Sequence, residues 1–155
     1  MYAAVNSCLA GFFIFRWNFH GGGITLVLFG IGLDLIETVR IKNVIERTGD
    51  RFLERVYTAG EQSYCRTRRD PYPCFAARFA AKEAVLKALG TGLAGSRWTD
   101  VEIVVGRSGK PEAVLRGGAA HTASQLGVGR VLVSITHSRS CAAAMAVALV
   151  KEVGK

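Results

Sequence analysis

The sequence lacks several features that would place it in a common class of protein. No uninterrupted apolar run reaches about 18 residues, so we expect no membrane span. The four cysteines form no C-x-x-C pair, and the three histidines have no zinc-ligand spacing. The start of the chain lacks a cationic region and a small-residue cleavage site, so we expect no signal peptide. These absences favour a cytoplasmic protein whose cysteines are free thiols in a reducing compartment.

The charge of the chain is one-sided. Its 155 residues include 20 Lys and Arg but 12 Asp and Glu, and the formal net charge of +8 favours an acidic partner. No basic run is dense enough to mark a nucleic-acid surface, and the aromatic residues are not interleaved with the cations. Hydrophobic residues make up 50% of the chain, which predicts one globular domain with a modest core.

The most informative segment runs from Phe75 to Gly92 and predicts a helix. It is rich in Ala, Leu, Lys, Arg and Glu, which favour helices, and its glycines can take the left-handed conformation that ends one. Glu83 lies at the edge of an apolar face, and Lys87 follows one turn later. That face comprises Phe75, Phe79, Leu86 and Leu89. A carboxylate in this position indicates a cation or metal partner, and the alternative is a surface Glu–Lys pair.

A second segment, residues 24–37, is typical of a buried strand that runs into a bend at Gly30 and Gly32. Two glycines let a backbone turn tightly or approach another group closely. Asp34 follows at the end of this strand, where its carboxylate can face a ligand. It can also cap a helix that begins near Ile36, and the two roles are compatible.

The remaining segments predict a mixed α and β domain, of α+β class. Helices are expected at 38–47, 50–57 and 118–126, and strands at 101–105, 112–115, 131–136 and 142–150. The turn at 108–111 joins two strands as a hairpin. Residues 58–74 contain a glycine, two prolines and a basic cluster, which predict a loop.

Three motifs, in this order, resemble those of the holo-[acyl-carrier-protein] synthases, the short, trimeric 4′-phosphopantetheinyl transferases. Residues 30–37 resemble the first motif, residues 75–92 the second and residues 131–138 the third. The resemblance runs from about Leu28 to about Val150. It implies the 4′-phosphopantetheinyl transferase-like fold, a small antiparallel sheet packed on a long helix with shorter helices, over residues 24–155.

The resemblance also implies a reaction. The family moves the 4′-phosphopantetheine group of coenzyme A to a serine of apo acyl carrier protein, releases adenosine 3′,5′-bisphosphate, and serves fatty acid synthesis. Asp34 and Glu83 match the family's Mg²⁺ ligands, and Mg²⁺ prefers such oxygen donors. Lys87 matches a catalytic position, where it can neutralise the leaving phosphate or assist proton transfer. Glu37 either lies behind the metal ligands or is a charge at a helix N-terminus.

Other positions match residues that hold coenzyme A. Arg78 and His137 match positions near its phosphates, with a solvated helix residue and a core histidine as the respective alternatives. Lys110 matches a turn beside the nucleotide of a neighbouring subunit. Lys82 is assigned to coenzyme A too, with an ion-pair partner as the alternative. The same assignment covers Lys87, Gly90, Thr91 and Gly92.

The resemblance implies two macromolecular partners, an acidic carrier protein and two further copies of the chain. The carrier would meet a basic surface formed by Arg40, Arg47, Arg51 and Arg55, for which a solvated helix face is the alternative. The nucleotide is shared between subunits in the short family members, so a homotrimer is expected. Residues 1–23 precede the family's usual start and show no sustained period, so we expect a disordered or loosely packed extension.

The sequence is compatible with two other functions. A nucleic-acid-binding module without catalysis would fit the pI of about 9.7. A hydrolase could use Ser134, His137 and Asp34, but the chain has no G-x-S-x-G elbow.

Overall fold

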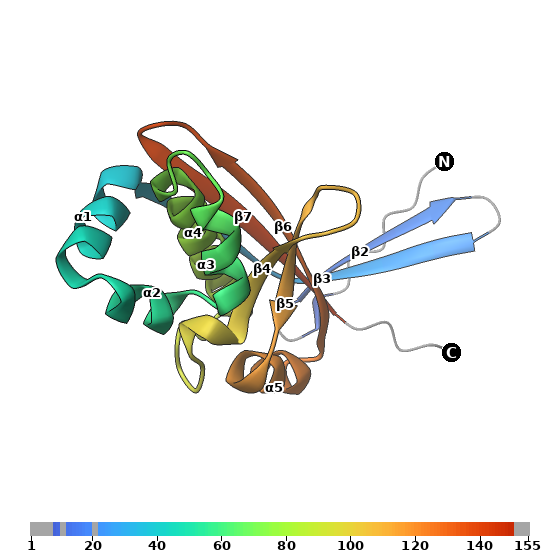
Figure 1. Ribbon diagram of the computed structural model, residues 1–155. Coiled ribbons are helices and arrows are strands. Elements are labelled where there is room, and N and C mark those ends of the chain that lie inside the picture. Colours follow the sequence, from blue (N-terminus) through green and yellow to red (C-terminus); the bar gives the residue numbers. More distant parts are fainter. Residues whose placement is uncertain (1–7, 10–11, 20–21, 151–155) are drawn as a thin grey trace.

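One antiparallel sheet packs against helices in the computed structural model, which describes residues 8–9, 12–19 and 22–150, with side chains from residue 27 onward (Figure 1). The strands described are ordered β1-β2-β3-β7-β6-β5-β4. Their bounds are Cys8–Leu9 (β1), Phe12–Phe19 (β2), Gly22–Glu37 (β3), Val101–Val105 (β4), Pro111–Leu115 (β5), Val128–His137 (β6) and Cys141–Val150 (β7). The helices are Thr38–Thr48 (α1), Asp50–Val56 (α2), Ala59–Arg66 (α3), Tyr72–Leu89 (α4), Gly117–Gln125 (α5) and the 3₁₀ turn Trp98–Asp100 (η1). The predicted α+β class is confirmed.

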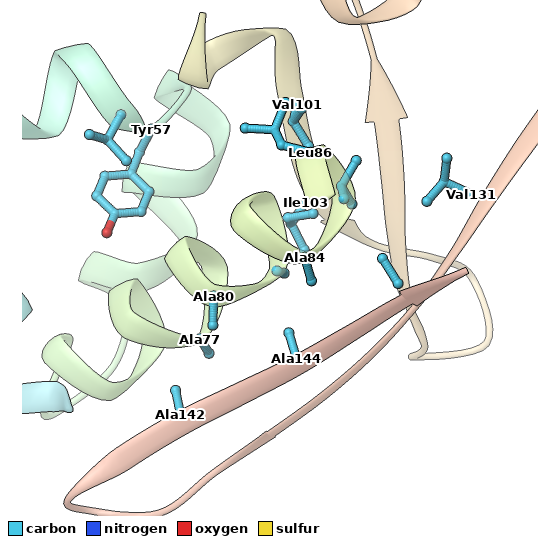
Figure 2. Packing of buried hydrophobic residues seen from close by; sticks show 14 of the residues in the cluster. Tyr57, Ala77, Ala80, Ala84, Leu86, Val101, Ile103, Val131, Ala142 and Ala144 are labelled. Carbon is cyan, nitrogen blue, oxygen red and sulfur yellow. The ribbon is translucent and has the colours of Figure 1, made fainter. Parts of the chain in front are cut away.

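The long helix α4 lies across β3 and β7 and forms the centre of the core. Strand β7 presents a row of buried alanines to it: Ala142, Ala144, Ala146 and Ala148. Figure 2 shows Ala142 and Ala144 projecting from β7 toward the helix. Because these side chains are small, the helix can lie close to the sheet. On another side of α4, the rings of Tyr57 and Phe75 pack with centroids 4.9 Å apart, so α4 is buried on more than the one face predicted.

Gly30 and Gly32 lie within a strand that continues to Glu37, so no bend ends the strand there, although its pairing with β7 shifts register between Leu28 and Gly30. Their role is close approach: a Cβ on Gly32 would collide with the carbonyl oxygen of Ala84, and one on Gly30 with that of Ala88. Strand β3 therefore runs directly against the backbone of α4. Asp34 lies inside this strand and does not cap a helix.

Helix α3 occupies a segment where we predicted a loop, and that prediction is wrong. A capping box begins the helix: the Thr58 hydroxyl accepts from the Glu61 N–H at 3.3 Å, and the Glu61 carboxylate accepts from the Thr58 N–H at 2.9 Å. The other predicted helices and strands are confirmed, with shifts at their ends. Among the residues that the structure describes, no helix combines the length and apolarity that crossing a membrane requires.

The described part of residues 1–23, where we expected a disordered or loosely packed extension, contains strands. Phe13–Phe19 in β2 pair with Gly22–Leu28 in β3, and this hairpin extends away from the helices (Figure 1). Pairing of β3 with β7 begins at Leu28 and continues to Glu37. Gly30 and Gly32, which lie against α4, are thus outside the part of β3 that pairs with β2. Whether the extension is needed for function stays a prediction.

The face of the sheet turned away from α4 carries exposed apolar side chains. On β3, Ile31, Leu33 and Leu35 alternate with residues that face α4, and Leu33 is 65% exposed. Met145 on β7 pairs with Leu33, and Leu132 on β6 adds another exposed apolar side chain to the same face. We call this set of five the apolar face. A contiguous exposed apolar surface of this kind marks an interaction site.

Cys65 and Cys74 form a disulfide that joins α3 to the start of α4, with Cα atoms 5.5 Å apart. The prediction of free thiols is therefore wrong for this pair, because it did not include α3, which brings the two positions together. Cys141 is free. Cys8 lies in β1, where the structure describes the backbone alone.

Candidate functional site

Asp34 and Lys87 meet where β3 crosses the last turns of α4. The Lys87 ammonium donates to Asp34 Oδ1 at 2.7 Å and to the carbonyl oxygen of Leu33 at 3.1 Å. The Asp34 side chain is 16% exposed and that of Lys87 48%, so the pair lies at the surface with its carboxylate half sheltered. The hydrogen bond to Asp34 raises the pKa of Lys87, which keeps it cationic. Two motifs that are far apart in the sequence thus converge here.

Glu83 lies one turn before Lys87 and is half-buried. Burial and the negative charge of Asp34 raise the pKa of Glu83, and Lys87 opposes this shift. Two carboxylates therefore lie near one ammonium, which is paired with Asp34, and the excess negative charge suits a cation. Mg²⁺ in proteins commonly takes one or two carboxylates and completes its shell with water and phosphate oxygens. Asp34 and Glu83 fit such an ion, and the described residues contain no set of three or more His, Cys, Asp and Glu arranged for a metal.

The loop Gly90-Thr91-Gly92 follows directly after α4. Gly90 and Gly92 adopt left-handed conformations, with φ of 74° and 54°, which ends the helix sharply. The Thr91 hydroxyl between them is buried and has no protein partner. An unpartnered buried hydroxyl is costly, so this hydroxyl has a hydrogen bond left to make. Binding of coenzyme A by this loop stays a prediction.

A groove of about 640 Å³ lies between α3, α4, the β4–β5 turn and the end of β6. Its polar lining residues include Tyr64, Arg68, Asp70, Arg78, His137 and Arg139. Three arginines against one aspartate make the groove positive, so it suits an anionic ligand. His137 is exposed at the end of β6, which excludes the alternative of a core histidine.

Arg78 is the buried cation of this groove, at 7% exposure. It donates from Nη1 to Cys74 Sγ at 3.0 Å, and its guanidinium carbon lies 4.3 Å from the centre of the Tyr64 ring. Its Nε has no partner, and the described residues give it no carboxylate within ion-pair distance. Burial lowers the pKa of Arg78, and the charge of Glu61 opposes this. A buried guanidinium with an unused donor is prepared for an anion, so the alternative of a solvated helix residue is wrong.

Lys82 lies apart from both groups, in the core, at 0% exposure. Its ammonium is 2.8 Å from Glu61 Oε2 and donates to the carbonyl oxygens of Trp98, at 3.0 Å, and Val101. All three N–H donors are used, so Lys82 takes the alternative role of an ion-pair partner and has no donor left for coenzyme A. Sequence reasoning missed Glu61, whose other oxygen accepts from the Ile103 N–H at 3.0 Å.

Lys110 and the groove lie on two sides of the β4–β5 turn. Gly109 borders the groove, whereas Lys110 is exposed and lines a separate hollow of about 860 Å³ between β5, α5 and β6. Within one chain, Lys110 therefore does not join the other predicted coenzyme A residues.

Helix α4 separates the carboxylates from the groove. Lys87 follows Arg78 by nine positions, so at about 100° per residue their side chains leave opposite sides of the helix. Lys87 contacts β3, while Arg78 borders the groove with Ile103 of β4 and Ile135 of β6. A single chain thus presents two half-sites that face away from each other.

The predicted carrier surface is exposed. Arg40 and Arg47 on α1 and Arg51 and Arg55 on α2 all face solvent, and no ion pair between described residues includes them. Glu37 is the residue before α1. Its side chain is exposed and makes no capping hydrogen bond.

The residues of the hydrolase alternative do not assemble. Ser134 and His137 are three positions apart on β6, so their side chains leave opposite faces of the sheet. Asp34 is bound to Lys87 on another strand. The structure therefore excludes this triad.

The chain is similar to known proteins over most of its length. A model of the 4′-phosphopantetheinyl transferase superfamily matches residues 30–146. The chain is 50% identical over 123 residues to the holo-[acyl-carrier-protein] synthase of Desulforudis audaxviator, which covers 79% of this chain and 94% of that protein.

Solved structures show the same similarity. The holo-[acyl-carrier-protein] synthase of Neisseria meningitidis superposes with a TM-score of 0.72 at 32% identity, over 78% of this chain and 98% of that one. The synthase of Bacillus anthracis, in complex with coenzyme A (3′,5′-ADP), superposes with a TM-score of 0.66 at 31% identity, over 80% of this chain and 98% of that one.

Proposed function

Because the chain belongs to the 4′-phosphopantetheinyl transferase superfamily, we propose that Asp34, Glu83 and Lys87 form its catalytic centre and that the groove at Arg78 binds coenzyme A. The chain transfers phosphopantetheine from coenzyme A to apo acyl carrier protein. The observation that carries the assignment of the site is the 2.7 Å ion pair between Lys87 and Asp34 beside half-buried Glu83, since it joins the first two motifs.

Asp34 and Glu83 would hold Mg²⁺. When bound, the ion neutralises charge on the pyrophosphate oxygens of coenzyme A, where the bond to the leaving group breaks. The two carboxylates come from β3 and α4, whose backbones are in contact at Gly32 and Ala84. Their separation is therefore set by packing of the core, which gives the site a preorganised pair of oxygen donors.

Lys87 would stabilise the negative charge that grows on the phosphate in the transition state. Its ammonium already lies between the two motifs and is held by Asp34 and the Leu33 carbonyl oxygen. A cation placed in advance costs little reorganisation during the reaction. The unpartnered hydroxyl of Thr91 lies in the loop after the same helix and would bind a phosphate oxygen.

The groove at Arg78 would bind the phosphates at the nucleotide end of coenzyme A. Arg78 is buried with a free Nε, and Arg68, Arg139 and His137 line the same groove. An arriving phosphate would supply the charge partner that the Arg78 guanidinium lacks, and charge-assisted hydrogen bonds of this type are strong.

A homotrimer would complete each site. The two half-sites face opposite sides of α4, so the carboxylates of one copy need the groove of a neighbour to surround one coenzyme A molecule. The apolar face supplies a surface that association would bury, and its area would drive assembly. Lys110 would then reach the nucleotide held by another copy.

The carrier would dock on α1 and α2, where Arg40, Arg47, Arg51 and Arg55 leave their charges unpaired. Complementary charge would mainly raise the rate of encounter with an acidic carrier. We place this reaction in the cytoplasm and expect no nucleic acid among the partners. The alternative, a nucleic-acid-binding module, predicts salt-sensitive binding of DNA or RNA without any need for a metal.

Mass spectrometry of the carrier tests this function. Apo carrier is incubated with the protein and coenzyme A, in Mg²⁺ or in excess chelator. We expect the carrier to gain the mass of the phosphopantetheine arm in Mg²⁺ and no mass in chelator. Equal gain in both would refute the Mg²⁺ assignment, and no gain in either would refute the transfer.

A further inference from the structure

We propose that the Cys65–Cys74 disulfide is a redox-sensitive site that controls how tightly the groove binds coenzyme A. Binding is tight while the bond is closed and weaker when it is reduced. This inference rests on the proposed function, because it takes coenzyme A as the ligand of the groove.

The disulfide is in direct contact with the cation that would bind the phosphate. Cys74 Sγ accepts a hydrogen bond from Arg78 Nη1 at 3.0 Å, one helical turn away on α4. Tyr64, whose ring covers the Arg78 guanidinium, is the neighbour of Cys65 on α3. The same covalent bond thus joins the two elements that hold Arg78 in place.

Reduction changes the charge beside Arg78. A disulfide sulfur is neutral, so in the closed form the guanidinium keeps its charge for the ligand. A free thiol beside an arginine has a lowered pKa and readily becomes a thiolate. A Cys74 thiolate would pair with Arg78 and compete with the phosphate of coenzyme A, which lowers the affinity.

The bond can be reached from the groove. Cys74 lines the groove, whereas Cys65 is fully buried, so a dithiol reductant would attack the sulfur of Cys74. The S–S bond breaks, Cys65 leaves as a thiolate and takes a proton, and a mixed disulfide forms at Cys74. The second thiol of the reductant then closes its own disulfide and releases Cys74 as a thiol or thiolate, so two electrons pass from the dithiol to the protein.

A redox role also accounts for a disulfide in the compartment that we propose for this chain. In reducing compartments disulfides are usually transient and catalytic or redox-sensing. Cys74 borders the groove that would bind substrate, so a change in the redox state of the pair would change the affinity for the ligand.

Calorimetry with adenosine 3′,5′-bisphosphate tests the proposal, since this probe has the 3′-phosphate and one 5′-phosphate of coenzyme A but no thiol that could itself reduce the bond. The full-length protein is titrated after oxidation and again in excess dithiothreitol, and a thiol reagent in denaturant counts two fewer thiols in the oxidised form. We expect reduction to weaken binding about tenfold, within the usual range for coupling between two sites. Equal affinity of the two forms, or equal thiol counts, would overturn the inference.

Two single variants separate charge from cross-linking. Cys65→Ser leaves a thiol beside Arg78, and Cys74→Ser leaves none there, although neither can close the bond. We expect Cys65→Ser to bind as weakly as the reduced protein and Cys74→Ser to bind within about twofold of the oxidised one, with Cys141→Ser as the control that keeps the redox response. Circular dichroism melts establish that each variant is folded. Equal weakening in both variants would overturn the charge mechanism.

The transfer assay distinguishes failure of this inference from failure of the proposed function. Unchanged affinity on reduction, with transfer intact, overturns the redox site alone. An oxidised protein that neither binds the bisphosphate nor transfers the arm overturns both.

Discussion

Two lysines on α4 show that the position of a residue on one helix determines whether its charge serves the fold or faces the surface. Lys82 and Lys87 are five residues apart, yet Lys82 is sealed in the core by Glu61, while the Lys87 ammonium extends to Asp34 on β3. The buried pair is fully used by the fold, because removing one partner would leave an unpaired charge inside. Lys87 keeps a half-exposed ammonium that a substrate can reach.

Replacing Lys87 by Ala should act on the chemical step. Its charge is most useful where negative charge grows in the transition state, so we expect kcat to fall about 100-fold while KM for coenzyme A changes little. Steady-state transfer rates over a range of coenzyme A concentrations check this, with Lys42→Ala at saturating carrier as the control. A change confined to KM would instead assign Lys87 to binding of the ground state.

Sequence reasoning placed Asp34, Glu83 and Lys87 in one candidate site because they match the family's motifs, and the structure brings Asp34 and Lys87 together. It could not distinguish the role of Lys82 from that of Arg78, since both are cations on the same helix. Their roles depend on α3, which carries Glu61 and Tyr64 and was not predicted. The loop prediction gave weight to Gly60 and two prolines and overlooked the capping signal of Thr58 and Glu61.

At the scale of elements, β3 shows a similar limit. The glycines at 30 and 32 are compatible with a bend or with close contact, and only the position of α4 decides between them. The strand, helix and hairpin segments with clear periodicity were predictable, because their local pattern agrees with their packing.

The contact between α3 and β4 should make stability depend on pH through Glu102. Partial burial alone would raise the pKa of Glu102, but hydrogen bonds from Arg116 and Thr58 outweigh burial and lower it below its ordinary value. The stabilisation is therefore present above the unfolded pKa and is lost as pH falls through the folded pKa. We expect Glu102→Gln to lower the free energy of unfolding by about 1 kcal/mol at pH 7 and by much less near pH 3.

Urea unfolding at both pH values measures this effect, and Glu54→Gln, an exposed carboxylate on α2, is the control. A loss for Glu102→Gln that is the same at both pH values would show that packing, rather than charge, accounts for it.

Removal of residues 1–23 should leave transfer intact. Strand β2 pairs with β3 only up to Leu28, whereas the site depends on Gly32 and Asp34, which pair with β7. A chain that starts at Ile24 behind a new Met should therefore fold and transfer at nearly the full rate. Loss of folding or of activity would show that the hairpin belongs to the domain.

At the scale of the whole molecule, the described residues present two half-sites and one apolar face. The half-sites lie on opposite sides of α4, and the apolar face covers the side of the sheet that α4 leaves open. Association through the apolar face would bury exposed leucines and bring different halves together, so assembly and activity would be coupled.

Mixing two inactive variants tests this coupling. Glu83→Gln disables the carboxylate half and Arg78→Ala the groove half, so each alone should be nearly inactive. If sites are shared, mixed oligomers contain some sites with both halves intact, and transfer should recover to a sizeable fraction of the wild-type rate. Recovery after co-expression is measured by the mass gain of the carrier, with light scattering to count the copies. An active monomer, or no recovery in mixed oligomers, would argue for a site within one chain.

The most direct measurement is the transfer rate of Asp34→Ala and Glu83→Ala across a titration of Mg²⁺. Each variant removes one oxygen donor and relieves repulsion between the carboxylates. The metal-free melting temperature of Glu83→Ala should therefore stay level or rise, whereas Asp34→Ala also loses the ion pair with Lys87, which offsets this gain. We expect transfer to fall at least about 100-fold in both variants, even at saturating Mg²⁺. Rates near that of the wild type in both variants would contradict the account and place the catalytic centre elsewhere.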